Sequence, residues 1–318
     1  MKSPPSLVIM VVSIRVYYWR VLFLLNLRNI YRDFREVFGI SGLPGFFDDF
    51  QNWLGSWSLK GNLLENKQSG TSVSDIDSYN TICNLASIDE KVFKKFKSNK
   101  EYKAILEHVS RKQGSEYLNM ISDKEILKEI SGNKIQEFGR PYKYHYRGFG
   151  RISPTQLRYF KTLSDLKELF GNLDGYKIVE IGPGYGGLAQ TIANHFKIDN
   201  YALIDLPPAI ELAKVYLSRY GSDSTFEFCH SSTATTSFSD LAISNYAFSE
   251  INKSHQKVLL DHVLSKAKRG YIIYNKIPSV AHEFLTIEEI CNKLSNPEVV
   301  EEIPKTGEEN KLIIWGHR

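Results

Sequence analysis

Three glycines in the stretch "EIGPGYGG" have the spacing of a turn that binds a nucleotide. Gly182, Gly184 and Gly187 match G-x-G-x-x-G between a strand-like run, 177–181, and a helix-like run, 188–196. In that context the glycines let a cofactor approach the backbone closely. The spacing alone does not distinguish a dinucleotide from S-adenosylmethionine.

Two carboxylates beside this turn narrow the choice of cofactor. Glu180 stands two positions before Gly182 and suits a cationic ligand, such as the amino and sulfonium groups of S-adenosylmethionine. A pyrophosphate needs helix N–H donors and no anion nearby, so Glu180 disfavours NAD as the cofactor. The alternative role of Glu180 is a structural one, in which its carboxylate caps the glycine turn. Asp205, at the end of the next strand-like run, can accept hydrogen bonds from the ribose hydroxyls that both cofactors carry.

Methyl transfer to a hydroxyl requires alignment of the acceptor and removal of its proton. Asn245 ends another strand-like run, and Glu250 follows it in the stretch "YAFSE". We predict that Glu250 is the base, with a helix cap as its alternative role. His255, one helical turn further on, is the second candidate, and it can equally be a surface residue.

Alternating strands and helices position these groups from residue 176 onward. The strand-like runs are 176–181, 200–205, 225–229, 240–245 and 270–275, and the helix-like runs are 187–196, 208–219 and 253–267. Two further runs, 298–303 and 311–316, flank a glycine-containing turn and predict a hairpin that makes the last strand antiparallel. The fold class is therefore α/β, with a mainly parallel sheet covered by helices on both faces.

Several stretches have a familiar combination of residues: "EIGPGYGGLAQTI", "YALIDLPPAIELAKVYL", "DLAISNYAFSEIN" and "GYIIYN". Together with "FGRISPTQLRYF" they resemble the sugar O-methyltransferase family of bacterial polysaccharide gene clusters, over residues 140–318. The resemblance implies a class I Rossmann-like methyltransferase fold, S-adenosylmethionine as cofactor and a saccharide hydroxyl as acceptor.

The resemblance also implies further cofactor contacts. Leu206 belongs to the "IDLP" stretch, and His230 with Ser231 follows the third strand, where methyltransferases contact the adenine. The lead-in stretch places Tyr159 on the substrate side.

Aromatic and basic residues alternate in "GRPYKYHYRGFGR", residues 139–151, and include Arg140, Tyr144 and Arg147. Aromatic rings can stack on a sugar, and arginines can bind the phosphates of a nucleotide-linked or lipid-linked sugar. A linker folded over the sheet is the alternative. His145 has no second ligand at helical spacing, so no metal site is predicted.

The sequence divides into a basic hydrophobic helix, 1–38, a linker, 39–75, a helical region with the lead-in, 76–170, and the cofactor domain, 171–318. Ser122 and Glu125 predict a capping box in the helical region. The whole chain has a net charge of +4, and residues 1–35 alone carry six basic side chains and one acidic side chain. The remaining chain is near neutral, which disfavours nucleic acid as a partner.

The apolar stretch 7–27 is long enough to span a bilayer but contains Arg15 and Arg20. A helix over 7–38 that lies on an anionic membrane surface is one interpretation, and packing within the protein is the other. Three widely separated cysteines indicate a reducing compartment. We therefore expect a cytoplasmic protein, with peripheral contact to the inner face of the membrane under the first interpretation.

Two other classes of function compete with a methyltransferase. An NAD(P)-dependent oxidoreductase or epimerase is disfavoured by Glu180, by the terminal hairpin and by the absence of Tyr-x-x-x-Lys. A non-catalytic scaffold with a methyltransferase fold is disfavoured by the intact glycine turn.

Overall fold

The computed structural model describes four stretches of the chain: 76–132, 135–231, 238–276 and 283–317. The predicted N-terminal helix, 1–38, and the predicted linker, 39–75, lie outside these stretches. In the described part of the chain, no helix is both long and apolar enough to cross a membrane.

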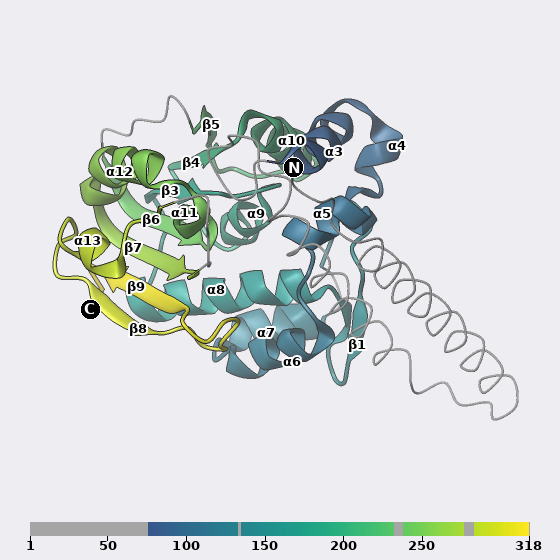
Figure 1. Ribbon diagram of the computed structural model, residues 1–318. Coiled ribbons are helices and arrows are strands. Elements are labelled where there is room, and N and C mark those ends of the chain that lie inside the picture. The colour runs from purple at the N-terminus through teal and green to yellow at the C-terminus, as the bar shows by residue number, and fades with distance from the viewer. Residues whose placement is uncertain (1–75, 133–134, 232–237, 277–282, 318) are drawn as a thin grey trace, which may run out of the picture. The chain divides into compact units, whose positions relative to one another are not determined.

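A seven-stranded sheet forms the centre of the described chain (Figure 1). Its strands are β3 (Lys177–Ile181), β4 (Asn200–Asp205), β5 (Phe226–His230), β6 (Ser239–Asn245), β7 (Ala267–Tyr274), β8 (Glu298–Glu301) and β9 (Lys311–Trp315). They are ordered β5-β4-β3-β6-β7-β9-β8, and the first five in this order are parallel. The last strand, β9, is antiparallel to both β7 and β8, as the terminal hairpin predicted.

Both faces of the sheet are buried, because successive strand residues enter different apolar clusters. On β3, Ile178 belongs to a cluster with the helices before β5, whereas Val179 belongs to a cluster with the later helices. The first set comprises α8 (Pro154–Phe170), α9 (Gly187–Ala193) and α10 (Pro207–Leu217). The second comprises α11 (Ala247–Glu250), α12 (Lys253–His262), η2 (Leu264–Lys266) and α13 (Ile287–Cys291). The predicted two-sided α/β arrangement is thus confirmed.

A mainly helical region precedes the sheet and packs on its first set of helices. It consists of α3 (Asp77–Ile88), α4 (Glu90–Phe93), η1 (Phe96–Ser98), α5 (Lys100–Ile105), α6 (Arg111–Met120), α7 (Lys124–Ser131) and a short hairpin, β1 (Tyr144–Tyr146) with β2 (Gly150–Ile152). Helix α3 packs against α10, and α6 packs against α8. Their apolar side chains belong to the same core as the first face of the sheet.

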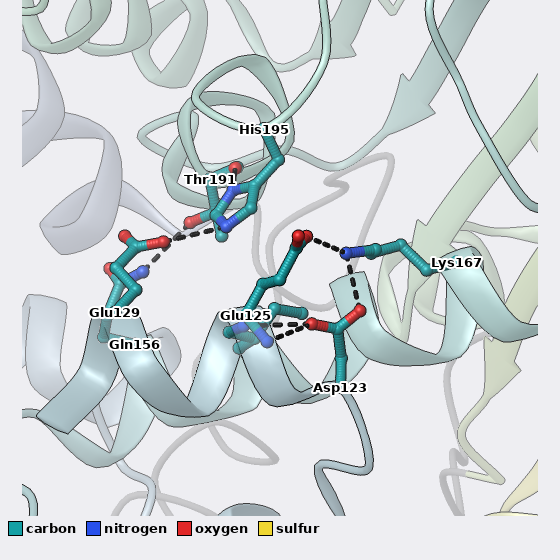
Figure 2. A network of polar contacts seen from close by, with 8 residues as sticks. Asp123, Glu125, Glu129, Gln156, Lys167, Thr191 and His195 are labelled. Carbon is teal, nitrogen blue, oxygen red and sulfur yellow. Dashed lines mark hydrogen bonds and ion pairs between the residues drawn. The ribbon is translucent and has the colours of Figure 1, made fainter.

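Polar contacts also fasten α7 to α8 and α9 (Figure 2). Lys167 of α8 donates to Asp123 at 2.5 Å, and His195 donates through Nε2 to Glu129 at 2.8 Å. The other ring nitrogen of His195 lies 2.8 Å from the Thr191 carbonyl oxygen. Burial opposes the charged imidazolium, but Glu129 and Thr191 outweigh that effect and raise the pKa of His195.

The predicted capping box at Ser122 is wrong by one residue. Asp123 is the N-cap of α7, and its carboxylate accepts the N–H groups of Glu125 and Ile126 at 2.9 and 3.0 Å. Aspartate is as good an N-cap as serine, and here it also pairs with Lys167, which fixes the helix start.

Candidate functional site

The glycine turn lies where β3 ends and α9 begins, at the edge where the parallel strands end. Gly182 and Gly184 have φ angles of 74° and 56°, a region that favours glycine. A Cβ on Gly182 would lie 2.0 Å from the Cβ of Ala247, and one on Gly184 would lie 2.7 Å from Leu106 Cδ1. The turn therefore tolerates no side chain at these two positions.

Two predicted residues meet at the start of α9. A Cβ on Gly187 would lie 2.5 Å from the ring of Tyr159, a residue of α8. The structure thus brings Tyr159 against the glycine turn, closer to the predicted cofactor site than the sequence indicated.

Asp205 is held against the turn by two backbone donors. Its Oδ2 accepts the N–H of Gly184 at 2.9 Å, and its Oδ1 accepts the N–H of Leu206 at 2.7 Å. Each carboxylate oxygen can accept a second hydrogen bond, which suits a pair of hydroxyls. Burial raises the pKa of Asp205 to about 6, while the two backbone hydrogen bonds oppose the rise. The group is therefore mostly ionised at neutral pH.

Glu180 is buried more deeply, with 3% of its surface exposed. It accepts a hydrogen bond from the Tyr201 hydroxyl at 2.8 Å. Burial raises the pKa of Glu180 to about 8; the Tyr201 hydrogen bond opposes this rise, and the charge of Asp205 adds to it. Such a carboxyl holds its proton at neutral pH and gives it up when a cation arrives.

The end of β6 has two features that are typical of a ligand site. Both amide atoms of the Asn245 side chain are buried and have no hydrogen-bond partner among the described residues. Tyr246, the next residue, has φ 71° and ψ −38°, which is unusual for a residue with a side chain. Unpaired buried amides and left-handed aromatic residues both cost free energy, and such costs concentrate at functional sites.

The two candidate bases lie after this strand. Glu250, the last residue of α11, accepts a hydrogen bond from the Asn275 side chain at 3.2 Å, and Asn275 follows β7. His255 lies in the first turn of α12, where its Nδ1 is 2.8 Å from the side-chain oxygen of the N-cap, Asn252. Glu250 thus stands at the edge where strands end, and His255 is tied to a helix cap; the role of each stays a prediction.

His230 and Ser231 lie beside the end of β4. His230 is the last residue of β5 and is paired in register with Asp205, and the N–H of Ser231 donates to the Asp205 carbonyl at 2.9 Å. The predicted adenine contacts are thus next to the predicted ribose acceptor.

Three of the predicted substrate residues lie on or beside the small hairpin. Arg140 is exposed, with φ 55°; Tyr144 is half-buried on β1; and Arg147 is exposed in the hairpin turn. The hairpin packs on α6, where the Tyr146 hydroxyl donates to the Arg111 carbonyl at 3.4 Å. The contribution of these residues to substrate binding stays a prediction.

No sequence signal indicated the hollow that opens between α6, α8 and the ends of β6 and β7. Its enclosed part is small, about 10 Å³, which is room for a single water-sized group, and the rest opens to solvent. We call it the tyrosine hollow, after its polar lining: Tyr117, Arg158, Lys161, Tyr246, Tyr271 and Glu302. These residues come from distant parts of the chain, and Tyr246 alone stands in a stretch that the sequence singled out.

A metal centre has no support in the described residues. No group of three or more histidine, cysteine, aspartate or glutamate side chains gathers there in a way that could hold an ion.

The strand order, the antiparallel last strand and the glycine turn before α9 define a class I methyltransferase fold. No family model matches the chain, and no curated protein matches it.

Solved methyltransferase structures resemble it weakly. Magnesium protoporphyrin IX methyltransferase from Synechocystis PCC 6803 with bound S-adenosylmethionine has a TM-score of 0.40 and 16% identity, over 50% of this chain and 77% of its own. The N-methyltransferase NodS from Bradyrhizobium japonicum WM9, with S-adenosyl-L-homocysteine, has a TM-score of 0.37 and 16% identity, over 50% and 85%. An O-methyltransferase family protein from Burkholderia thailandensis has a TM-score of 0.39 and 10% identity, over 51% and 56%. The fold assignment rests on the strand order, to which such distant likenesses add nothing.

Proposed function

We propose that this protein is an S-adenosylmethionine-dependent O-methyltransferase that acts on a sugar hydroxyl of a bacterial surface polysaccharide or its precursor. The main support is the arrangement at one sheet edge: a glycine cradle, the buried carboxyl group of Glu180, the half-buried one of Asp205 and the Asn245 amide, which has no partner among the described residues. The sugar acceptor is supported by the sequence resemblance over residues 140–318.

The residues at the glycine turn fit S-adenosylmethionine. Asp205 has acceptor capacity for the two ribose hydroxyls, and Glu180 can match the cationic methionyl part. Leu106, which follows α5, stands against Gly184 and so borders the same space. When bound, this cofactor supplies an electrophilic methyl group on its sulfonium.

The residues after β6 fit the other half of the reaction. The Asn245 amide can donate to and accept from an acceptor hydroxyl, which would orient it. Glu250 would take the hydroxyl proton, since a carboxylate at the strand edge is within the region where the acceptor must lie. His255 is the second candidate for this step.

Glu180 also bears on NAD(P)-dependent chemistry. Because burial raises its pKa to about 8, this carboxyl gains a favourable ion pair only when the ligand group beside it is a cation, and a pyrophosphate offers none. The antiparallel β9 likewise belongs to the methyltransferase sheet. An oxidoreductase or epimerase is therefore not favoured.

Calorimetry of the full chain with S-adenosylmethionine, S-adenosylhomocysteine and NAD⁺ tests the cofactor. We expect micromolar binding of the first two and no binding of NAD⁺. Binding of NAD⁺ alone would contradict the proposal, and binding without turnover on any glycan would favour the scaffold. Mass spectrometry of surface glycan from a deletion strain should then show the loss of one methyl group.

A further inference from the structure

Arg158 is a buried cation that has no ion-pair partner among the described residues. The residue is 7% exposed, and its Nε has no hydrogen-bond partner among the described residues. No ion pair joins it to a carboxylate in that part of the chain, and its closest aromatic neighbours are the rings of Tyr159 and Tyr246, each 5.7 Å from the guanidinium. A charge removed from water in this way is unfavourable unless a partner arrives.

The other charges of the tyrosine hollow are already engaged. Lys161 pairs with Asp165 at 2.6 Å, and Asp165 also accepts a hydrogen bond from Tyr271 at 2.6 Å. Glu302 accepts a hydrogen bond from Tyr246 at 2.5 Å. Lys161 and Asp165 thus cancel each other on one side of the hollow. Glu302 is a second anion of the lining, but no carboxylate of the described residues forms an ion pair with the guanidinium.

Two buried carboxyl groups, those of Glu302 and Glu107, are candidates for a partner of Arg158. Glu302 accepts further hydrogen bonds from the Thr306 N–H and the Asn310 side chain, both at 3.0 Å, so its carboxylate is stabilised without Arg158. Burial raises the pKa of Glu107, and Arg158 is among the charges that oppose this rise, but the two form no ion pair. Neither carboxyl therefore fills the place of a direct partner.

The position of the hollow assigns it to the acceptor and not to the cofactor. Tyr246 directly follows β6, Ile273 lies near the end of β7, and Leu312 lies on β9. The glycine turn and Asp205, in contrast, lie at the ends of β3 and β4. The two groups of residues occupy neighbouring halves of one sheet edge, as the two reactants of a methyl transfer must.

We propose that the acceptor binds at the open mouth of the tyrosine hollow, and that Arg158 pairs there with an anionic group that the acceptor sugar carries, a carboxylate or a phosphate. The planar guanidinium suits both anions, because each can receive two parallel N–H bonds. The half-buried ring of Tyr246 provides apolar surface for the sugar, whereas Tyr117 and Tyr271 are buried. This inference rests on the proposed function and narrows its substrate to acidic sugars.

Binding of three simple sugars tests the inference: glucuronate, glucose 6-phosphate and neutral glucose, each titrated into the full chain. We expect one or both anionic sugars to bind at least about tenfold more tightly than glucose, because a hydrogen bond to a charged group contributes at least that much to affinity. Comparison of the two anions distinguishes a carboxylate from a phosphate. In Arg158→Gln the preference should vanish, whereas S-adenosylmethionine affinity should change by less than about threefold.

Two more variants complete the test. Arg158→Lys keeps the positive charge but loses the two parallel N–H donors of the guanidinium, so this variant should keep only part of the preference for anionic sugars. Lys167→Gln removes a cation from the same helix that pairs with Asp123 instead, and should bind the sugars like the wild type. Circular dichroism checks that each variant is folded. If Arg158→Gln is unfolded, Arg158→Lys replaces it in the test: a reduced preference for anionic sugars supports the inference, and an unchanged preference contradicts it.

Three results would overturn the inference. They are equal binding of anionic and neutral sugars by the wild type, an anion preference that survives in folded Arg158→Gln, and loss of S-adenosylmethionine binding in that variant with the sugar preference intact. The last result would assign Arg158 to the methionyl carboxylate of the cofactor. Failure of the wild type to bind S-adenosylmethionine would instead contradict the proposed function, and it is measured independently of the sugars.

Discussion

Binding of a cationic cofactor should expel a proton from Glu180. Burial raises the pKa of this carboxyl to about 8, so about nine tenths of the molecules carry the proton at pH 7. A cation beside the group favours its charged form and lowers its pKa. We therefore expect binding of S-adenosylmethionine at pH 7 to release up to about 0.9 proton for each molecule bound.

The same shift sets the pH dependence of affinity. Ionising Glu180 at pH 7 costs about one pKa unit, or roughly 1.4 kcal/mol, and at pH 6 about twice that. The dissociation constant should therefore fall about tenfold between pH 6 and pH 7. The α-amino group of the cofactor titrates above this interval, near 7.7–8.0, but Asp205, with a pKa of about 6, titrates within it, so the difference between the wild type and Glu180→Gln measures Glu180.

Calorimetry at pH 7 in buffers of different ionisation enthalpy measures the released proton. In Glu180→Gln the release should fall to about one tenth of a proton, the share that Asp205 still contributes with its pKa of about 6. The reasoning is refuted if the wild type releases less than about 0.2 proton, or if Glu180→Gln releases as much as the wild type.

Unfolding of the cofactor-free protein provides a second readout for Glu180. Its ordinary pKa of 4.5 is raised in the folded state, so the folded chain binds more protons than the unfolded chain between about pH 4.5 and pH 8. The free energy of unfolding should consequently decrease across this interval as pH rises. Glu180→Gln should lack this component of the decrease, and equal slopes in both proteins would contradict the assigned pKa.

The remaining predictions concern four other positions. Asp205→Ala should weaken S-adenosylmethionine binding by about 1–3 kcal/mol in calorimetry, since it removes a hydrogen-bond acceptor from a buried site, and unchanged affinity would rule out the ribose contact. The pKa of His195 is raised by Glu129, so its stabilising effect is complete below its unfolded value of 6.5 and is lost as pH rises through the higher folded value. Urea unfolding should accordingly show a larger loss of stability for His195→Gln at about pH 5.5 than at about pH 9, and the same loss at both would contradict the ion pair. Glu250→Gln should lower turnover at least about a hundredfold with S-adenosylmethionine affinity nearly unchanged, and His255→Gln less than about tenfold; the opposite ranking would move the base to His255.

The sheet could be predicted well because its local signals agree with its surroundings. Both faces of the parallel strands are buried, so β3 and β4 are largely apolar runs, in which Glu180 is the last residue but one of β3 and Asp205 is the last residue of β4. Predicted and observed strand ends differ by a few residues at most. The antiparallel pairing of β8 with β9 followed from the hairpin, which pairs neighbours in sequence, whereas the hairpin did not predict that β9 lies beside β7.

Helix α8 was not assigned as a helix from the sequence, although its start has a clear signal. Ser153 caps it and Pro154 occupies its first turn, a combination that favours a helix start. The helix packs against both α6 and α9, and polar residues such as Gln156 are buried with the apolar ones. A helix that is buried on several sides has no polar stripe, so its periodicity is weak.

The two halves of the site differ in how far the sequence could reveal them. The glycine turn and Asp205 are local features, since φ angles and a strand end constrain the residue types directly. The tyrosine hollow joins Tyr117 to Glu302 across most of the described chain, and no spacing rule links such positions. Arg158 is informative because no carboxylate of the described residues pairs with it, and such an absence is visible only in the packed structure. The sequence can therefore indicate which cofactor a fold takes, whereas the charge of the acceptor has to be inferred from the packed structure.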